Sequence, residues 1–342
     1  MTRGPQALPT DYTPSAGRMT GSSDVTRLGK GCRQSGSYDL LTGIEMPSTA
    51  TSGRREAKSM LVSDANMTAS GPTPHYALGS TDAEHERLIR QATWLAAHTE
   101  RLFREAGIGP GQRVLDLGSG VGDVVLIAAR LVGPSGEVVG IERDPRSTAR
   151  ATARMAEAGV HNVSFVQSDA AEIPGDKPFD AAVGRYILMF LPDPVSVLRS
   201  LSQLVRPGGV MAFQEPCWKS FLQQSARLPL WSVGASLLVE TFQRSGTNTE
   251  MGLALSRVFQ EAGLTAPSTR IDTLVGSEQW LPDCLHSLRP KMAQLNLSLK
   301  PLGDFETLSE RLQTEVTAFK TSTPLPDLVS AWSRKSASPA SH

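Results

Sequence analysis

The chain has 342 residues, which is enough for one large domain with insertions or for two modest domains. Its 34 lysines and arginines balance 34 aspartates and glutamates, so the formal net charge is zero, which argues against the basic surface of a nucleic-acid-binding protein. The cysteines Cys32, Cys217 and Cys284 form no C-x-x-C pair, so neither a disulfide framework nor a metal site is predicted, and a reducing cytoplasm is the expected compartment. No apolar run reaches the roughly 18 residues of a membrane-spanning helix.

Residues 1–72 are rich in Gly, Ser, Thr and Pro and show no sustained periodicity, so we expect a disordered N-terminal extension. A second interpretation, in which the protein proper begins at Met67, stays open. One folded domain is expected over residues 73–335, followed by a polar tail at 336–342.

Order is predicted to begin near residue 75, with an amphipathic helix over residues 82–106. Thr81 and Glu84 form a capping box before the apolar residues of this helix, and Gly107 ends it. Short apolar runs then alternate with helical stretches, which is typical of a parallel sheet covered by helices on both faces. The expected strands are 113–117, 137–142, 163–167, 179–185 and 209–214, and the expected helices are 122–131, 145–157 and 194–205.

The second half of the chain is less regular. Residues 217–247 are apolar and helix-like, 251–262 form a helix, 268–275 and 328–332 are strands, and 277–320 are helical with breaks at Pro282, Pro290 and Pro301. Two helical insertions, 217–247 and 277–320, therefore flank the last helix and strand. Such insertions are expected to cover a pocket at the carboxyl ends of the strands.

A glycine-rich turn, Asp116-Leu-Gly118-Ser-Gly120-Val-Gly122-Asp123, joins the first strand to the next helix. Turns of this kind bring backbone N–H groups close to a ligand. In dinucleotide-binding enzymes the ligand is a pyrophosphate, and the third glycine of G-x-G-x-x-G stands where this chain has Asp123. The Asp116 and Asp123 carboxylates would repel a pyrophosphate but favour the ammonium and sulfonium of S-adenosylmethionine (SAM). The alternative is a glycine turn that only packs helix against strand.

Two more carboxylates follow the next two strands. Glu142 ends the strand 137–142, about twenty residues past the loop, where an acid can accept hydrogen bonds from both hydroxyls of a ribose. Asp144 caps the following helix, which leaves Glu142 available for a ligand. Asp169 follows the strand 163–167, where it can accept a hydrogen bond from an adenine amine while Ala170 leaves room for the ring. The alternative role for Asp169 is a helix cap.

Together with the segment 179–191 and with Pro207-Gly208-Gly209, these features resemble in order and spacing the motifs of class I SAM-dependent methyltransferases. The closest resemblance is to the ubiquinone/menaquinone-methyltransferase-like group that acts on small molecules. It covers residues 75–216 and implies an α/β, doubly wound, mostly parallel seven-stranded sheet, the Rossmann-like methyltransferase fold, with helical cap insertions. The chain departs from the family where its second strand ends in Glu142-Arg143 instead of the commoner Asp, and where 277–320 exceeds the minimal fold.

The resemblance implies SAM as cofactor and a set of binding residues. Those at the methionine part would be Asp116, Gly118, Ser119 and Gly120. Those at the nucleoside would be Glu142, Arg143, Asp169 and Ala170. Arg185 would line the methyl-transfer site, and Tyr76 with Gln91 resembles a lid segment of related enzymes.

The expected function is methyl transfer from SAM to O, N or C of a small organic molecule. The alternatives are a nicotinamide-dependent oxidoreductase on the same sheet and a non-catalytic SAM-binding protein. No catalytic residue is assigned; the candidates for a base are His75, His85, His98, Tyr186 and Glu215. Because both insertions are rich in Trp, Phe and Leu, we expect a substrate with an apolar body, unless these aromatics only form the core of the cap. Neither a nucleic-acid partner nor an oligomeric state is predicted.

Overall fold

The computed structural model describes residues 78–169 and 177–336. The expectations for residues 1–72, His75, Tyr76, Ala170 and most of the tail at 336–342 lie outside the described residues.

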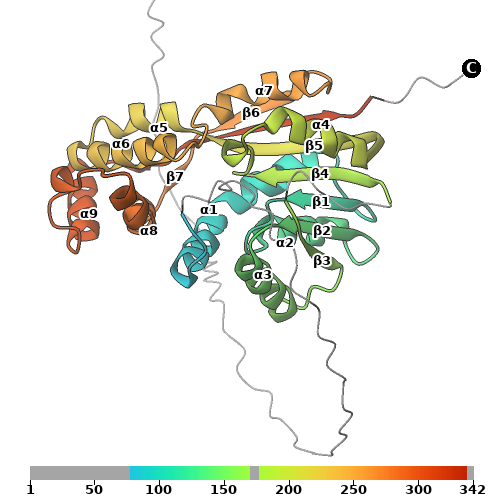
Figure 1. Cartoon of the computed structure of the whole chain (residues 1–342), viewed down its shortest axis with the longest axis horizontal. Helices are drawn as coiled ribbons and strands as arrows, with labels where there is room; N and C mark the ends of the chain where they lie inside the picture. Colours follow the sequence, from blue (N-terminus) through green and yellow to red (C-terminus); the bar gives the residue numbers. More distant parts are fainter. Residues whose placement is uncertain (1–77, 170–176, 337–342) are drawn as a thin grey trace, which may run out of the picture. The chain divides into compact units, whose positions relative to one another are not determined.

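The described residues form a seven-stranded sheet with the strand order β3-β2-β1-β4-β5-β9-β6 (Figure 1). The strands are β1 (Arg113–Leu117), β2 (Glu137–Glu142), β3 (Val163–Gln167), β4 (Phe179–Arg185), β5 (Val205–Cys217), β6 (Ser268–Asp272) and β9 (Asp327–Arg334). Strands β1 to β5 pair in parallel, while β9 is antiparallel to both β5 and β6. The order reverses between β1 and β4, and in open α/β sheets ligands bind outside the carboxyl ends of the strands at this point. The sheet is the expected Rossmann-like methyltransferase fold.

Helices cover both faces of the sheet, as predicted. They are α1 (Asp82–Ala106), α2 (Asp123–Val132), α3 (Pro145–Glu157), α4 (Pro194–Leu204) and α7 (Met251–Glu261). Alternate residues of β1 point to opposite faces: Val114 packs in a cluster with α1 and α2, whereas Leu115 packs in a cluster with α4 and α7. Two hydrophobic cores therefore hold the strand ends in place beneath the site.

Local capping signals explain where several helices begin. The hydroxyl of Thr81 accepts a hydrogen bond from the Glu84 N–H at 3.2 Å, and Gly107 ends α1 in the left-handed conformation. The carboxylates of Asp144 and Asp193 accept from backbone N–H groups at the starts of α3 and α4. These side chains satisfy N–H groups that the first turn of a helix leaves without a partner.

The two insertions are helical and pack on each other beyond the end of β5 (Figure 1). They contribute α5 (Trp218–Ser225), α6 (Pro229–Arg244), α8 (Trp280–Gln294), η2 (Lys300–Leu302) and α9 (Leu308–Phe319). A short turn, η1 (Leu188–Phe190), follows β4, and a two-stranded ribbon joins β7 (Val275–Gly276) to β8 (Thr323–Pro324). We call α5, α6, α8, α9 and this ribbon the cap. None of the helices in the described ranges is long and apolar enough to cross a membrane.

Three boundaries differ from the prediction. The strand expected at 268–275 ends at Asp272, because Val275 pairs with β8 instead of β9. The breaks expected at Pro282 and Pro290 are absent from α8. Pro282 lies in the first turn, which tolerates proline, and Pro290 lies inside the helix, where the buried Leu288 and Met292 hold the turn despite the lost hydrogen bond. Strand β5 runs over Val205–Cys217 instead of 209–214, and it continues to Cys217 because β9 pairs with it from Val210 to Cys217.

Candidate active site

A cavity of about 660 Å³ lies at the carboxyl ends of β1, β2 and β4, within the size range of small-molecule sites. Its sheet side is lined by Gly118, Ser119, Gly120, Glu142, Asp169 and Arg185. Its opposite side is lined by α1 and the cap. Of the sequence-predicted site residues that the structure describes, Arg143 and Gln91 also line the cavity, whereas Asp116 lies buried directly behind the glycine loop.

Asp116 is the most unusual group beneath this cavity. It is 1% exposed, and among the described residues neither carboxylate oxygen has a hydrogen-bond partner. Burial raises the pKa of Asp116 well above its ordinary range, the Arg185 guanidinium opposes this rise, and the Glu142 and Asp123 carboxylates add to it. A buried carboxylate without a partner is costly, so this position favours a cationic or hydrogen-bond-donating ligand.

The loop above Asp116 has the shape of a ligand cradle. Gly118 has φ +66°, and a Cβ there would lie 2.6 Å from the Ile187 side chain. Gly120 has φ +53°, and a Cβ there would meet no atom within 4 Å, so its backbone faces open space. The buried Ser119 hydroxyl also has no hydrogen-bond partner among the described residues. Orphaned polar atoms and an open glycine backbone fit the methionine part of SAM.

Glu142 is positioned at the same loop, but it is not free as expected. One carboxylate oxygen accepts a hydrogen bond from the Gly120 N–H at 2.9 Å, and the other accepts from the Asp144 N–H at 2.9 Å. Each oxygen can accept a further hydrogen bond, which is what a ribose diol would need. The carboxylate therefore joins the loop after β1 to the loop after β2.

Two arginines compensate the acidic loop. Asp123 forms an ion pair with Arg154 of α3 at 2.8 Å, with both side chains largely buried. Arg185, at the end of β4, donates to the Thr99 hydroxyl at 2.9 Å, and Thr99 in turn donates to Gln214. Hence only part of the negative charge at the loop remains for a cationic ligand. Among the described residues Asp116 has no hydrogen-bond partner, so it is the acidic group of this loop that a ligand can still engage.

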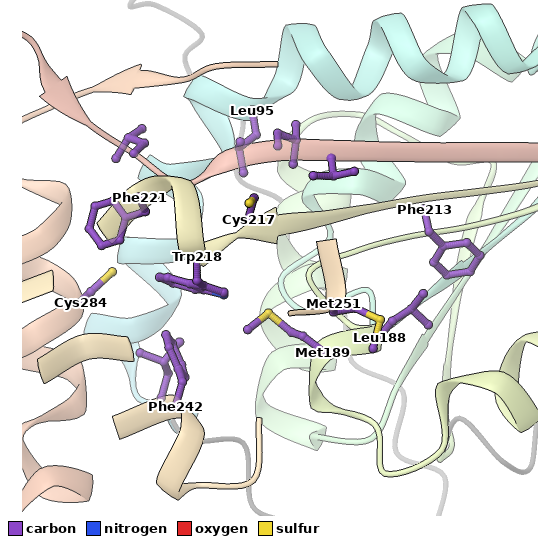
Figure 2. Close-up of a cluster of buried hydrophobic side chains, with 14 of the residues drawn as sticks. Leu95, Leu188, Met189, Phe213, Cys217, Trp218, Phe221, Phe242, Met251 and Cys284 are labelled. Carbon is purple, nitrogen blue, oxygen red and sulfur yellow. The ribbon is translucent and has the colours of Figure 1, made fainter. Parts of the chain in front are cut away.

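The cap contributes an aromatic wall to the cavity (Figure 2). Trp218 lies 5.1 Å from Phe242 and 6.5 Å from Trp280 between ring centroids, and the two indoles are nearly parallel. Figure 2 shows Trp218 next to Phe242, with Met189 facing them from the turn after β4. These aromatics both line the cavity and form part of the cap's core, so they do not serve the core alone. The apolar body expected for the substrate stays a prediction.

Polar side chains of α1 line the cavity next to this aromatic wall. Arg87 forms a bidentate ion pair with Glu84, at 2.6 and 2.7 Å, and both residues are buried. The third Arg87 nitrogen, Nη1, donates to the Gln91 carbonyl oxygen at 2.8 Å, and the Trp280 indole N–H donates to the same oxygen at 3.2 Å. Helix α1 is therefore bonded to α8 directly beside the cavity.

The turn after β4 projects Tyr186 into the cavity. Tyr186 has φ +56°, a left-handed conformation that is unusual for an aromatic residue and is often found at functional sites. One carboxylate oxygen of the buried Glu215 accepts from the backbone N–H groups of Ile187 and Leu188, at 3.0 and 2.8 Å. Glu215 thereby holds the turn that presents Tyr186.

The candidate bases lie at different positions relative to the cavity. Tyr186 lines the cavity, but burial raises its pKa above the ordinary range, so the hydroxyl keeps its proton. Glu215 and His85 do not line the cavity; His85 lies within hydrogen-bond distance of Ser147. His98 is not at the cavity either and lies 3.6 Å from Asp272. None of the described candidates is therefore placed as a base, and within the described ranges no His, Cys, Asp and Glu group is arranged to hold a metal ion.

We expect Glu215 to make stability depend on pH. Burial raises its pKa to about 8, so the folded chain binds a proton that the unfolded chain releases at lower pH. The free energy of unfolding should fall as pH rises from about 5 to about 8, with a limiting slope of about 1.4 kcal/mol per pH unit for one proton. Urea unfolding of Glu215→Gln, compared with the unchanged chain at pH 5.5, 7 and 8, should show a shallower decline. Equal slopes for the two proteins would contradict this assignment.

The comparisons with known proteins agree with this geometry. Residues 108–263 match the sequence family described as Methyltransferase domain. The chain therefore contains a methyltransferase domain. This domain covers β1 to β5, the loops that line the sheet side of the cavity, and the first insertion.

Individual relatives are methyltransferases of small molecules by name. The aklanonic acid methyltransferase of Streptomyces sp. (strain C5) is 38% identical over 112 residues, 32% of this chain and 50% of the relative. The demethylmenaquinone methyltransferase of Listeria monocytogenes serotype 4a (strain HCC23) is 29% identical over 179 residues, 49% of this chain and 74% of the relative. A SAM-dependent methyltransferase structure from Aquifex aeolicus has a TM-score of 0.44 and 18% identity, covering 57% of this chain and 93% of that one. This chain spans half or less of those relatives that are more than 30% identical to it.

Three further residues contact or line the site and were not predicted from the sequence: Arg87, Thr99 and Cys284. The sequence does contain a signal for the buried polar network around Arg87. Positions 84, 88, 91 and 95 recur at the three- and four-residue spacing that marks the buried face of a helix, yet 84 and 91 are Glu and Gln. Polar residues at core positions of a helix predict either a buried network or a binding site.

Proposed function

We propose that the protein transfers a methyl group from SAM to a small organic molecule held between the glycine loop and the cap. The observation that carries the proposal is the pair of buried Asp116 oxygens, which have no hydrogen-bond partner among the described residues and lie beneath a glycine loop within the matched methyltransferase domain. A pyrophosphate cofactor fits this loop poorly, because Glu142 already bonds the Gly120 N–H that a phosphate would need. This argues against the nicotinamide alternative.

In this proposal the residues at the sheet side bind the cofactor. Asp116, Gly118, Ser119 and Gly120 would hold the methionine part, and the residues at the nucleoside would be Glu142, Arg143 and Asp169, with Ala170 and Tyr76 outside the described residues. When bound, SAM supplies an electrophilic methyl group on a sulfonium. Arg185 lies at the end of β4 and keeps its place through Thr99, so it can help to fix the acceptor side of the cavity.

The chain's contribution to the reaction is then mainly positioning and exclusion of water. Holding a nucleophile in line with a methyl group converts a bimolecular step into an effectively unimolecular one. The aromatic wall and α1 cover the cavity and keep the acceptor dry. Since none of the described candidate bases is placed to act as one, the acceptor most in keeping with this site is one that is already nucleophilic near neutral pH.

An apolar acceptor is favoured over arsenite, which one relative from Halobacterium salinarum methylates by name. Cys284 lines the cavity whereas Cys217 does not, and Figure 2 shows the two sulfurs well apart from each other. Burial raises the pKa of Cys284 to about 12, so its thiolate is scarce. The two free cysteines also support the cytoplasm as the proposed compartment.

The proposal is tested with the full chain by isothermal titration calorimetry with SAM and with S-adenosylhomocysteine, followed by a turnover screen. We expect both compounds to bind in the micromolar range, and NADH fluorescence to be unchanged on addition of the protein. In the screen, methyl-tritiated SAM is incubated with pooled metabolites, and label should enter an extractable small molecule. Folded protein that binds neither compound contradicts the proposal, whereas binding without turnover favours the non-catalytic alternative.

A further inference from the structure

The orientation of the Gln91 amide is fixed by its neighbours. Its carbonyl oxygen accepts hydrogen bonds from Arg87 and from the Trp280 indole, and both of these groups can only donate. The oxygen and the nitrogen of this amide are thus assigned by chemistry. The amide nitrogen is left with two N–H donors and with no acceptor on any described residue. Since Gln91 lines the cavity, these donors are available to a ligand.

Tyr186 provides a second donor at the same end. Its hydroxyl bonds to no described residue, and the chain holds the ring in the cavity by a strained turn fixed at Glu215. Tyr186 and Cys284 both line the cavity, and the Cys284 thiol contacts Arg87 at 3.6 Å. Arg87 is also bonded to Gln91, so Cys284, Arg87 and Gln91 form a continuous set of contacts beside the cavity that Tyr186 lines.

The charge of this end differs from that of the cofactor end. Among the described residues that line the cavity, the carboxylates are Asp123, Glu142, Asp144 and Asp169, and all of them belong to the loops after β1, β2 and β3 or to the start of α2. The cap end presents aromatic rings and hydrogen-bond donors. An ammonium group there would find no carboxylate to pair with and would lose its hydration.

We propose that the cap end of the cavity is a subsite for an acceptor molecule with an apolar body and a carboxylate or carbonyl oxygen, which accepts hydrogen bonds from Gln91 and Tyr186. The inference rests on the proposed function, because it places this molecule opposite the cofactor loop. It narrows the substrate class to oxygen-bearing apolar compounds and separates it from amines. Trp218, Phe242 and Trp280 pack against the apolar body.

Three matched probes test this subsite: 2-naphthoate, 2-acetylnaphthalene and protonated 2-naphthylmethylamine. Each is titrated into the full chain saturated with S-adenosylhomocysteine, and binding is followed by calorimetry. We expect the naphthoate and the ketone to bind, and the amine to bind at least about tenfold more weakly. Equal or tighter binding of the amine, or binding of none of the three to the loaded protein, would overturn the inference.

Two variants change the donors without removing a structural hydrogen bond. Gln91→Glu keeps an oxygen for Arg87 and Trp280 but replaces the cavity-facing N–H groups with a carboxylate oxygen. Tyr186→Phe removes only a hydroxyl that bonds to no described residue. We expect naphthoate affinity to fall by about 10-fold or more in each variant, the range for a hydrogen bond to a charged group. Gln260→Glu, the same change on the exposed side of α7, is the matched control and should bind naphthoate like the unchanged chain.

The affinity for S-adenosylhomocysteine distinguishes a failure of the proposed function from a failure of the subsite. If the unchanged chain does not bind S-adenosylhomocysteine, the proposed function itself is refuted. If the cofactor product binds but the two variants retain full naphthoate affinity, only the subsite is refuted. If Gln91→Glu weakens S-adenosylhomocysteine and leaves naphthoate unchanged, Gln91 belongs to the cofactor site, as the sequence resemblance implied, and the subsite assignment is wrong.

Discussion

Replacing Asp116 with Asn is expected to weaken SAM binding by about 10- to 100-fold while the free energy of unfolding stays constant or rises. The side chain is buried without a hydrogen-bond partner among the described residues, so the unloaded protein gains nothing from its charge. A ligand with an ammonium and a sulfonium gains from it, and a hydrogen bond to a charged group is worth about 1.5–3 kcal/mol. Calorimetry with SAM and urea unfolding of the same preparations measure the two quantities.

The pH dependence of SAM affinity provides the control. Because burial raises the pKa of Asp116, protonation of this carboxyl competes with the binding of a cationic ligand. The carboxyl must release its proton before it can pair with the ligand. The dissociation constant of the unchanged chain should therefore fall as pH rises. That of Asp116→Asn should change less. An Asn variant that binds SAM normally, or that unfolds, would mean that the carboxylate serves the fold and not the cofactor.

The sequence predicted the cofactor half of the fold to within a few residues because its signals are local. The boundaries of β1, β2, β3 and β4 follow apolar runs between glycines and capping residues, and Thr81 and Asp144 cap helices as expected. Parallel strands buried on both faces read as continuous apolar segments, which leaves little ambiguity about their identity. The position of the glycine loop can then be predicted from β1, the strand that precedes it.

The cap could not be predicted in the same way, because its structure depends on contacts between distant segments. Val275 leaves the main sheet only because β8, far along the chain, offers a partner. Pro290 stays helical only because buried neighbours in α8 pack against the rest of the cap. The role of Gln91 is set by Trp280 in the same manner, since the indole decides which end of the amide faces the cavity. Sequence spacing within α1 shows that Gln91 is on the buried face, but not what it meets there.

Replacing Arg87 with Met is expected to lower the free energy of unfolding by about 3–5 kcal/mol. Glu84 is fully buried, and Arg87 donates a hydrogen bond to each of its carboxylate oxygens, so the variant leaves a buried carboxylate without its counter-charge. The Gln91 oxygen loses a donor in the same variant. Urea unfolding measures the loss, and Arg90→Met is the matched control: it breaks the more exposed pair with Asp283 and should cost at most about 1 kcal/mol.

The double variant Glu84→Gln/Arg87→Met distinguishes the cost of an isolated charge from the value of the ion pair. Neutral residues of similar size often replace a buried ion pair without loss, so the double variant should recover most of the stability that Arg87→Met loses. Its naphthoate affinity should stay below that of the unchanged chain, because Gln91 is then oriented by Trp280 alone. If the double variant is as unstable as the single one, Arg87 stabilises the protein through its contacts with Gln91 and Cys284, and the buried pair is not the main source of its effect.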